Sequence, residues 1–86
     1  MELTFFSSSF CDPCAQTRVV LSEVARLVPQ AEVRELDVAR FNDEAAAAGI
    51  RSTPTVIIAN ADGAEVFRAV GVPTLDQVLV AASKAL

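Results

Sequence analysis

The sequence predicts a single α/β domain in which a four-stranded mixed sheet carries helices on both faces. Two observations lead to this fold class. The chain has 86 residues, the length of one small domain, so we treat residues 1–86 as a single unit. Strand-like and helix-like segments then alternate until a turn at Asp62-Gly63 joins two consecutive strands. The expected order is strand-helix-strand-helix-strand-strand-helix.

The first half of the chain supplies two strands and a long helix. Residues 2–7 are rich in residues that favour β structure, and residues 32–38 alternate in the manner of a second strand. Between them a loop leads into a helix that reaches about Val28, where Pro29 stops it. Its apolar residues recur at three and four positions and form one stripe: Val20, Leu21, Val24, Leu27 and Val28.

A short helix and two more strands follow. We expect Asn42 to cap a helix built mainly of alanine and Gly49 to close it. Residues 55–59 form a continuous apolar strand, of the kind that is covered on both faces. Residues 64–70 return antiparallel to that strand after the Asp-Gly turn.

The last helix has the clearest start signal in the sequence. Thr74 is followed three residues later by Gln77, which predicts a capping box. The helix should run to about Ala85. Its expected buried side consists of Leu75, Val78, Leu79 and Ala82.

The connections predict how the strands are arranged. Because the first three strands are joined through helices, we expect them to be parallel with right-handed crossovers, whereas the fourth pairs through a hairpin. The connection lengths favour the sheet order 2-1-3-4, with three flanking helices. The first strand then ends in the middle of the sheet, and sites in open α/β sheets lie at such strand ends. Cys11 follows that strand end.

Composition excludes several classes of function. The chain has no histidine, which removes His-based catalytic triads and His metal ligands, and its two cysteines cannot complete a four-ligand zinc site alone. The net charge is -4, and the seven basic residues are spread along the chain, so we expect no nucleic-acid partner. We see neither a targeting segment nor a membrane span, and we therefore expect a cytoplasmic protein without a membrane partner.

The cysteine pair is the candidate site. Cys11 and Cys14 lie on one face of the predicted helix start, at a separation that a disulfide can bridge. Pro13 suits a first-turn position, which places Cys11 at the positive end of the helix dipole, where a thiolate is stabilised. Lowering a thiol pKa from about 8.5 to about 7 needs roughly 2 kcal/mol. The carboxylate of Asp12 opposes this, so we expect a modest lowering and a reducing couple.

This pattern predicts dithiol chemistry with no cofactor beyond the Cys11–Cys14 disulfide. Cys11 would attack a substrate disulfide, and Cys14 would then resolve the mixed disulfide. Three alternatives remain open: a purely structural disulfide, a metal or iron–sulfur site shared by two protomers, and an adaptor that keeps the fold for protein binding.

Several segments in order resemble the thioredoxin superfamily. They are Phe10-Cys11-Asp12-Pro13-Cys14, the segment Gly49 to Ile58 with its Thr53-Pro54-Thr55 core, the Asp62-Gly63 turn and Val70-Gly71-Val72. The resemblance covers essentially the whole chain and is to short members that lack an N-terminal strand and helix. It implies a thioredoxin-like fold and a cis Thr53-Pro54 bond packed against the two sulfurs.

The resemblance also implies a substrate surface. The backbone of Thr53 would be free to pair with an extended substrate, and Gly71 would either line the substrate groove or only make the turn. The expected substrate-binding residues are Phe10, Asp12, Pro13, Thr53, Pro54 and Gly71.

The sequence departs from thioredoxin itself near the cysteines. Phe10 stands where tryptophan is usual, Asp12-Pro13 replaces Gly-Pro, and Phe5 stands where thioredoxin has a buried aspartate that takes a proton from the second cysteine. Asp12, Glu35, Asp37 or water remain as substitutes for that aspartate. The motifs typical of glutaredoxins are missing, which makes direct glutathione use the less supported alternative.

The expected function is therefore a small thiol–disulfide oxidoreductase, a thioredoxin-like protein-disulfide reductase that takes part in electron transport and cell redox homeostasis. Its expected partners are disulfide-containing proteins and an upstream thiol reductase or low-molecular-weight thiol, with the chain itself a monomer. The alternatives are a glutathione-linked, glutaredoxin-like reductant and a non-enzymatic metal or iron–sulfur module.

Overall fold

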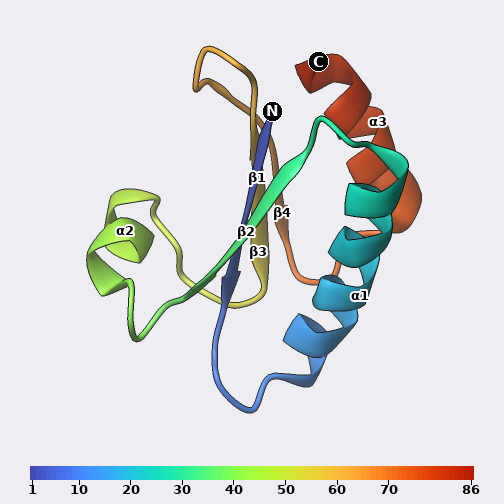
Figure 1. The fold of residues 1–86 in the computed structure, drawn as a ribbon. Helices are drawn as coiled ribbons and strands as arrows, with labels where there is room; N and C mark the ends of the chain where they lie inside the picture. Colours follow the sequence, from blue (N-terminus) through green and yellow to red (C-terminus); the bar gives the residue numbers. More distant parts are fainter.

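The computed structural model describes all residues, 1–86, and contains one four-stranded sheet (Figure 1). The sheet order is β2-β1-β3-β4, which confirms the predicted order 2-1-3-4. The strands are β1 (Glu2–Ser7), β2 (Glu32–Asp37), β3 (Thr55–Ala59) and β4 (Glu65–Val70). Their bounds lie within one residue of those expected from the sequence.

The direction of β3 differs from the prediction. β1 and β2 are parallel, but β3 runs antiparallel to β1, with Phe6 opposite Thr55 and Glu2 opposite Ala59. The expectation of three parallel strands was wrong because β2 ends and β3 begins at the same end of the sheet. The helix between them, α2 (Asn42–Ala47), has six residues and rises about 9 Å, whereas a six-residue strand is roughly 20 Å long. The helix is therefore too short to return the chain to the end of the sheet where β2 begins. The pairing of β4 with β3 is antiparallel, as predicted.

The three helices cover both faces of the sheet, which confirms the layered architecture. Helices α1 (Asp12–Leu27) and α3 (Leu75–Ala85) lie on one face, and α2 lies on the other (Figure 1). The main core is on the α1 and α3 side and includes Leu3, Phe5, Cys14, Leu21, Val24, Val56, Ile58, Val78, Ala81 and Ala85. A smaller core under α2 contains Phe6, Leu36 and Ala45. One of the two candidate cysteines is therefore part of the main core.

The buried stripe of α1 differs from the predicted one. The residues of the helix that are fully buried are Cys14, Thr17, Leu21 and Val24. Leu27 is 44% exposed and lies about 100° around the helix from the centre of this stripe, so its place in the core was wrongly predicted. A threonine occupies a core position that the apolar pattern did not include.

The ends of α2 are only partly as expected. Asn42 is the first helical residue, and the N-cap is Phe41, which makes no side-chain capping bond. The predicted Asn42 cap is therefore wrong. Gly49 does close the helix: it adopts a positive φ of 71°, its N–H donates to Ala46, and the N–H of Ile50 donates to Ala45. This is the glycine-dependent helix ending that the sequence predicted.

The start of α3 confirms the capping box. The backbone N–H of Gln77 donates to Oγ1 of Thr74 at 3.1 Å, and the N–H of Thr74 donates to Oε1 of Gln77 at 3.0 Å. Val78 and Ala82 are buried as predicted, whereas Leu75 and Leu79 are only partly buried against the core. None of the helices is long and apolar enough to cross a membrane.

Candidate active site

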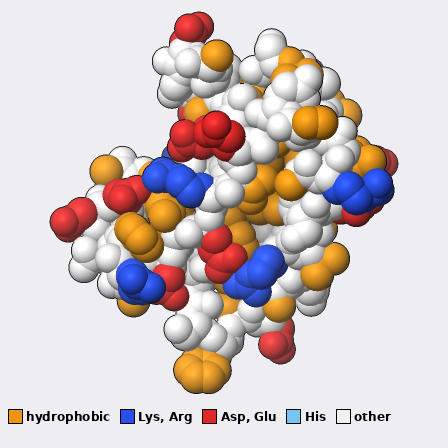
Figure 2. Space-filling model, in the orientation of Figure 1, with side chains coloured by type: hydrophobic (Ala, Val, Ile, Leu, Met, Phe, Trp, Pro, Cys, Tyr) orange, Lys and Arg blue, Asp and Glu red, His pale blue; other side chains and the backbone are white.

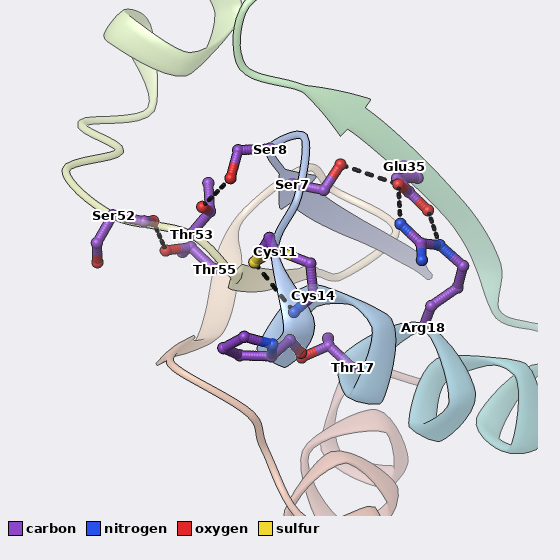
Figure 3. Close-up of a disulfide and its surroundings, with 11 residues drawn as sticks. Ser7, Ser8, Cys11, Cys14, Thr17, Arg18, Glu35, Ser52, Thr53 and Thr55 are labelled. Atoms are coloured by element: carbon purple, nitrogen blue, oxygen red, sulfur yellow. Dashed lines mark hydrogen bonds and ion pairs between the residues drawn. A yellow bond between two sulfur atoms is a disulfide. The ribbon is translucent and has the colours of Figure 1, made fainter.

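The two cysteines form a disulfide at the N-terminus of α1 (Figure 3). Cys11 is the N-cap residue, with extended backbone angles, and Cys14 lies three residues further on in the first turn. Their Cα atoms are 5.1 Å apart, and Sγ of Cys11 accepts a hydrogen bond of 3.1 Å from the backbone N–H of Cys14. The sulfur of Cys11 therefore takes the capping position that a serine or aspartate oxygen normally fills.

The two sulfur-bearing residues differ sharply in exposure. Cys14 is 1% exposed and belongs to the main core, whereas Cys11 is only partly buried. A disulfide of another protein can therefore approach Cys11 but not Cys14. The chain folds so that one cysteine of the pair is presented and the other is held behind it.

The surroundings of Cys11 favour its thiolate form. The first turn of a helix has backbone N–H groups without helical partners, and the helix dipole adds a positive potential there. The hydrogen bond from Cys14 directs one of these N–H groups at the Cys11 sulfur. Asp12, exposed and next in the chain, places a negative charge close by, as expected from the sequence.

Pro13 and Thr17 shape the first turn of α1. Pro13 occupies a first-turn position, as predicted, where its missing N–H costs no helical hydrogen bond. The hydroxyl of Thr17, which is wholly buried, donates to the carbonyl oxygen of Pro13 at 2.9 Å. Sequence reasoning missed Thr17, although its spacing from Cys14 and Leu21 places it on the buried stripe.

A second loop lies beside the disulfide and contains the cis Thr53-Pro54 bond that the resemblance implied. Pro54 is buried, and its carbonyl oxygen accepts a hydrogen bond of 2.9 Å from the N–H of Gly71. The hydroxyls of Thr53 and Ser8 are 2.7 Å apart, so this loop is tied to the segment that precedes Cys11 (Figure 3). Ser8 is a contributor that the sequence did not reveal.

The backbone of Thr53 is unpaired. Neither its N–H nor its C=O takes part in a hydrogen bond within the chain. The neighbouring hydroxyl of Thr55 instead donates to the carbonyl of Ser52 at 2.8 Å, which fixes the loop on its inner side. Thr53 thus retains a free backbone donor and a free backbone acceptor.

Three of the remaining expected substrate-binding residues are exposed beside the cysteines, and Gly71 is partly buried. Phe10 has a positive φ of 55° and a fully exposed ring immediately before Cys11. Asp12 and Pro13 are exposed after it. Gly71, bonded to Pro54, stands on the side of the cis-proline loop. The structure therefore gathers all of the predicted residues around the two loops.

The position of the missing aspartate is filled by the buried ring of Phe5. Glu35 of β2 lies opposite Phe5 of β1. The guanidinium carbon of Arg18, on α1, lies 5.8 Å from the centre of the Phe5 ring. Arg18 donates to both carboxylate oxygens of Glu35, at 2.8 and 2.7 Å, and Ser7 donates to one of them at 2.9 Å. These three residues form a polar cluster on the disulfide side of β2 (Figure 3).

This cluster keeps Glu35 ionised. The hydrogen bonds from Arg18 are the main cause that lowers the pKa of Glu35, and the bond from Ser7 adds to it, against the opposing effect of burial. A carboxylate with a lowered pKa is a poor acceptor for a thiol proton. Asp37 was another candidate for the group that takes the proton of Cys14. It accepts hydrogen bonds from the backbone N–H groups of Ala39 and Arg40 and so caps a turn.

Acidic and basic side chains are intermingled on the face of the molecule shown in Figure 2. An apolar hollow of about 180 Å³ lies between α1 and β2, and Arg18 and Glu35 are among its lining residues. Two other ion pairs are formed by Arg34, with Glu2 and with Glu44. Arg18 and Arg34 are thus engaged with neighbouring carboxylates.

A disulfide capping the first helix of a small α/β domain, beside a cis-proline loop, defines a class of thiol–disulfide oxidoreductases. The thioredoxin family model matches residues 2–84, and the chain belongs to the thioredoxin family.

Solved structures share the fold of this chain. A mutant thioredoxin from Halobacterium salinarum is 29% identical, with a TM-score of 0.86 over 99% of this chain and 74% of that one. Thioredoxin from Fasciola hepatica is 23% identical, with a TM-score of 0.85 over 99% of this chain and 80% of that one. A malarial protein is 15% identical, with a TM-score of 0.85 over 99% and 96%. No curated protein sequence gives a significant match. Family membership supports thiol–disulfide oxidoreductase activity in general terms.

Proposed function

We propose that this protein reduces disulfide bonds in other proteins by dithiol exchange, with Cys11 as the nucleophile and Cys14 as the resolving cysteine. The observation that carries the proposal is the asymmetry of the pair. Cys11 is accessible and accepts a hydrogen bond at its sulfur, whereas Cys14 is buried behind it. A large substrate can therefore meet one sulfur only.

The reaction starts from the reduced pair. The Cys11 thiolate attacks one sulfur of the substrate disulfide, forms a mixed disulfide and releases the other substrate sulfur as a thiolate. Cys14 then loses its proton and attacks Sγ of Cys11. This step breaks the mixed disulfide and releases the second substrate thiol. The substrate gains two electrons, and the protein is left with the Cys11–Cys14 disulfide.

Substrate binding in this scheme uses the cis-proline loop. The free N–H and C=O of Thr53 pair with an extended segment next to the substrate cysteine, in the manner of an added strand. Phe10, Asp12, Pro13, Pro54 and Gly71 surround that segment. The exposed ring of Phe10 supplies apolar contact area beside the reacting sulfur.

Regeneration completes the cycle. An upstream thiol reductase or a low-molecular-weight thiol reduces the Cys11–Cys14 disulfide again, and no other cofactor is required. We place this cycle in the cytoplasm, where thiols are kept reduced and a close cysteine pair is more often catalytic than structural. A glutathione-coupled assay, run beside one with a thioredoxin reductase, distinguishes the two kinds of donor.

Reduction of insulin by dithiothreitol tests the proposed activity. The wild-type protein should accelerate the precipitation of reduced insulin chains, and Cys11→Ser should remove the acceleration. Ser83→Ala, a change on an exposed part of α3, serves as a control that keeps full activity. A wild-type protein that is no faster than Cys11→Ser would refute the proposed reductase activity.

A further inference from the structure

A groove on the outer side of α3 carries side chains that the redox site does not use. It lies between α3 and the edge strand β4 and encloses about 420 Å³. Val66, Phe67, Val80 and Ala81 form its apolar part. Val80 is 55% exposed although it lies in the middle of a helix, so this apolar surface is open to solvent.

Two side chains of opposite charge lie at equal sequence separations from Val80. Asp76 and Lys84 also line the groove, four residues before and four residues after Val80. Residues four apart lie on one face of a helix and are separated by about 6 Å along its axis. Neither Asp76 nor Lys84 forms an ion pair within the chain.

This stripe of Asp76, Val80 and Lys84 is complementary to itself. A two-fold axis through Val80 brings Val80 against its symmetry mate, and it brings Asp76 of each copy to Lys84 of the other. Stripes of residues spaced by four pack against each other in the commonest helix crossing, and two-fold interfaces use the same patch on both subunits. We propose that the chain self-associates through this face of α3, with a second copy of itself as the partner.

The proposed contact leaves the disulfide open. The loop between β1 and α1 lies at the bottom of the molecule in Figure 1, and α3 lies at its upper right. Association through α3 therefore does not cover Cys11, and both forms stay competent for redox chemistry. The contact is small and its ion pairs are exposed, so the dimer is weak and the monomer expected from the sequence is the form at low concentration.

Sedimentation equilibrium of the wild-type protein tests the proposal directly. The apparent mass should rise from monomer towards dimer as the concentration increases to the millimolar range, and added salt should weaken the association. A wild-type chain that remains monomeric throughout this range overturns the proposal and leaves the face to a different protein or to solvent.

Charge reversal then tests the symmetry. Asp76→Lys or Lys84→Asp alone replaces two attractive contacts in the dimer with two repulsive ones and should raise the dissociation constant by about tenfold. The double variant Asp76→Lys/Lys84→Asp restores both attractive contacts and should return close to the wild-type value. If the double variant dissociates more readily than either single one, the proposed pairing is wrong.

Helix stability cannot produce the same result. Asp76 lies in the first turn of α3 and Lys84 in the last, so both complement the helix dipole. The double variant has the least favourable helix and yet should associate better than the single variants.

A valine pair provides the apolar control. Val80→Glu should abolish association, whereas Val19→Glu, a change at a 71% exposed valine of α1, should leave it unchanged. Insulin reduction should be unaffected in both variants, which separates this proposal from the proposed redox function. Equal effects of the two substitutions on association would contradict an interface centred on Val80.

Discussion

The backbone N–H of Cys14 donates a hydrogen bond of 3.1 Å to the sulfur of Cys11. In the mechanism that we propose, the resolving residue therefore also stabilises the sulfur of the nucleophile. The bond needs only the backbone of residue 14, so it is kept when the Cys14 side chain is replaced. It accounts for the different roles that we assign to the two cysteines.

The thiol pKa of Cys11 should be lower than that of Cys14. We expect Cys11 to titrate below the ordinary thiol value of about 8.5, because it caps a helix N-terminus. Burial of Cys14 should raise its pKa. Thiolate absorbance as a function of pH, measured in Cys14→Ser and in Cys11→Ser, gives the two values. A Cys11 pKa at or above that of Cys14 would contradict the assignment.

Removing the charge of Asp12 should lower the pKa of Cys11 further. The carboxylate of the residue next to a cysteine opposes thiolate formation in a solvated setting by about 0.3–0.5 pH units. Asp12→Asn should therefore shift the thiolate titration down by that amount, with the shift shrinking in high salt. Asp62→Asn, in the turn between β3 and β4, is the control and should cause no shift. A higher pKa of Cys11 in Asp12→Asn would contradict the proposed effect of the Asp12 charge.

The buried hydroxyl of Thr17 should contribute measurably to stability. Thr17→Val keeps the shape of the side chain but removes the hydrogen bond to Pro13, and it should cost about 1 kcal/mol in the free energy of unfolding. Ser22→Ala removes a bond of the same kind, to Arg18, on the exposed side of α1 and should cost much less. Urea unfolding of both variants checks the difference, and equal losses would be inconsistent with a special role for Thr17.

The Arg18–Glu35 pair should make stability depend on acid pH. Folding lowers the pKa of Glu35 below its ordinary value of 4.5, so the unfolded chain binds the proton more readily. The stabilisation is complete above that value and is lost as the pH falls through the folded-state pKa. Because the side chains are 51% and 36% exposed, Glu35→Gln should cost at most about 1 kcal/mol at neutral pH.

The same comparison at low pH completes this test. The stability difference between wild type and Glu35→Gln should shrink in acid, where the wild-type carboxyl is also neutral. Glu32→Gln, on the same strand but without an ion pair, should show no such trend. A Glu35→Gln difference that stays constant from neutral to acid pH would show that the pair does not supply it.

Local patterns predicted the elements and the cysteine pair, whereas the cis-proline loop was expected only from the family resemblance. The capping box at Thr74, the helix ending at Gly49 and the cysteine spacing at Cys11 and Cys14 all depend on residues within a few positions of one another. Such signals are visible in a sequence because their geometry is local. The sheet order followed from the lengths of the connections.

Contacts between distant segments were not predictable in the same way. The direction of β3 depends on the end of the sheet at which the chain emerges from α2. The hydrogen bond between Ser8 and Thr53 joins residues 45 positions apart. Arg18 meets Glu35 only because α1 packs beside β2. Single hydroxyls and single charges carry no pattern that identifies such partners in advance.

Trapping of a mixed disulfide tests the central claim most directly. Cys14→Ser should form a stable covalent complex with a disulfide-containing protein, joined through Cys11 and released by dithiothreitol. Cys11→Ser should form little or none, because its remaining cysteine is buried. Mass spectrometry of the joined peptides identifies the cysteine. Complexes formed through Cys14 as readily as through Cys11 would contradict the assignment of Cys11 as the nucleophile.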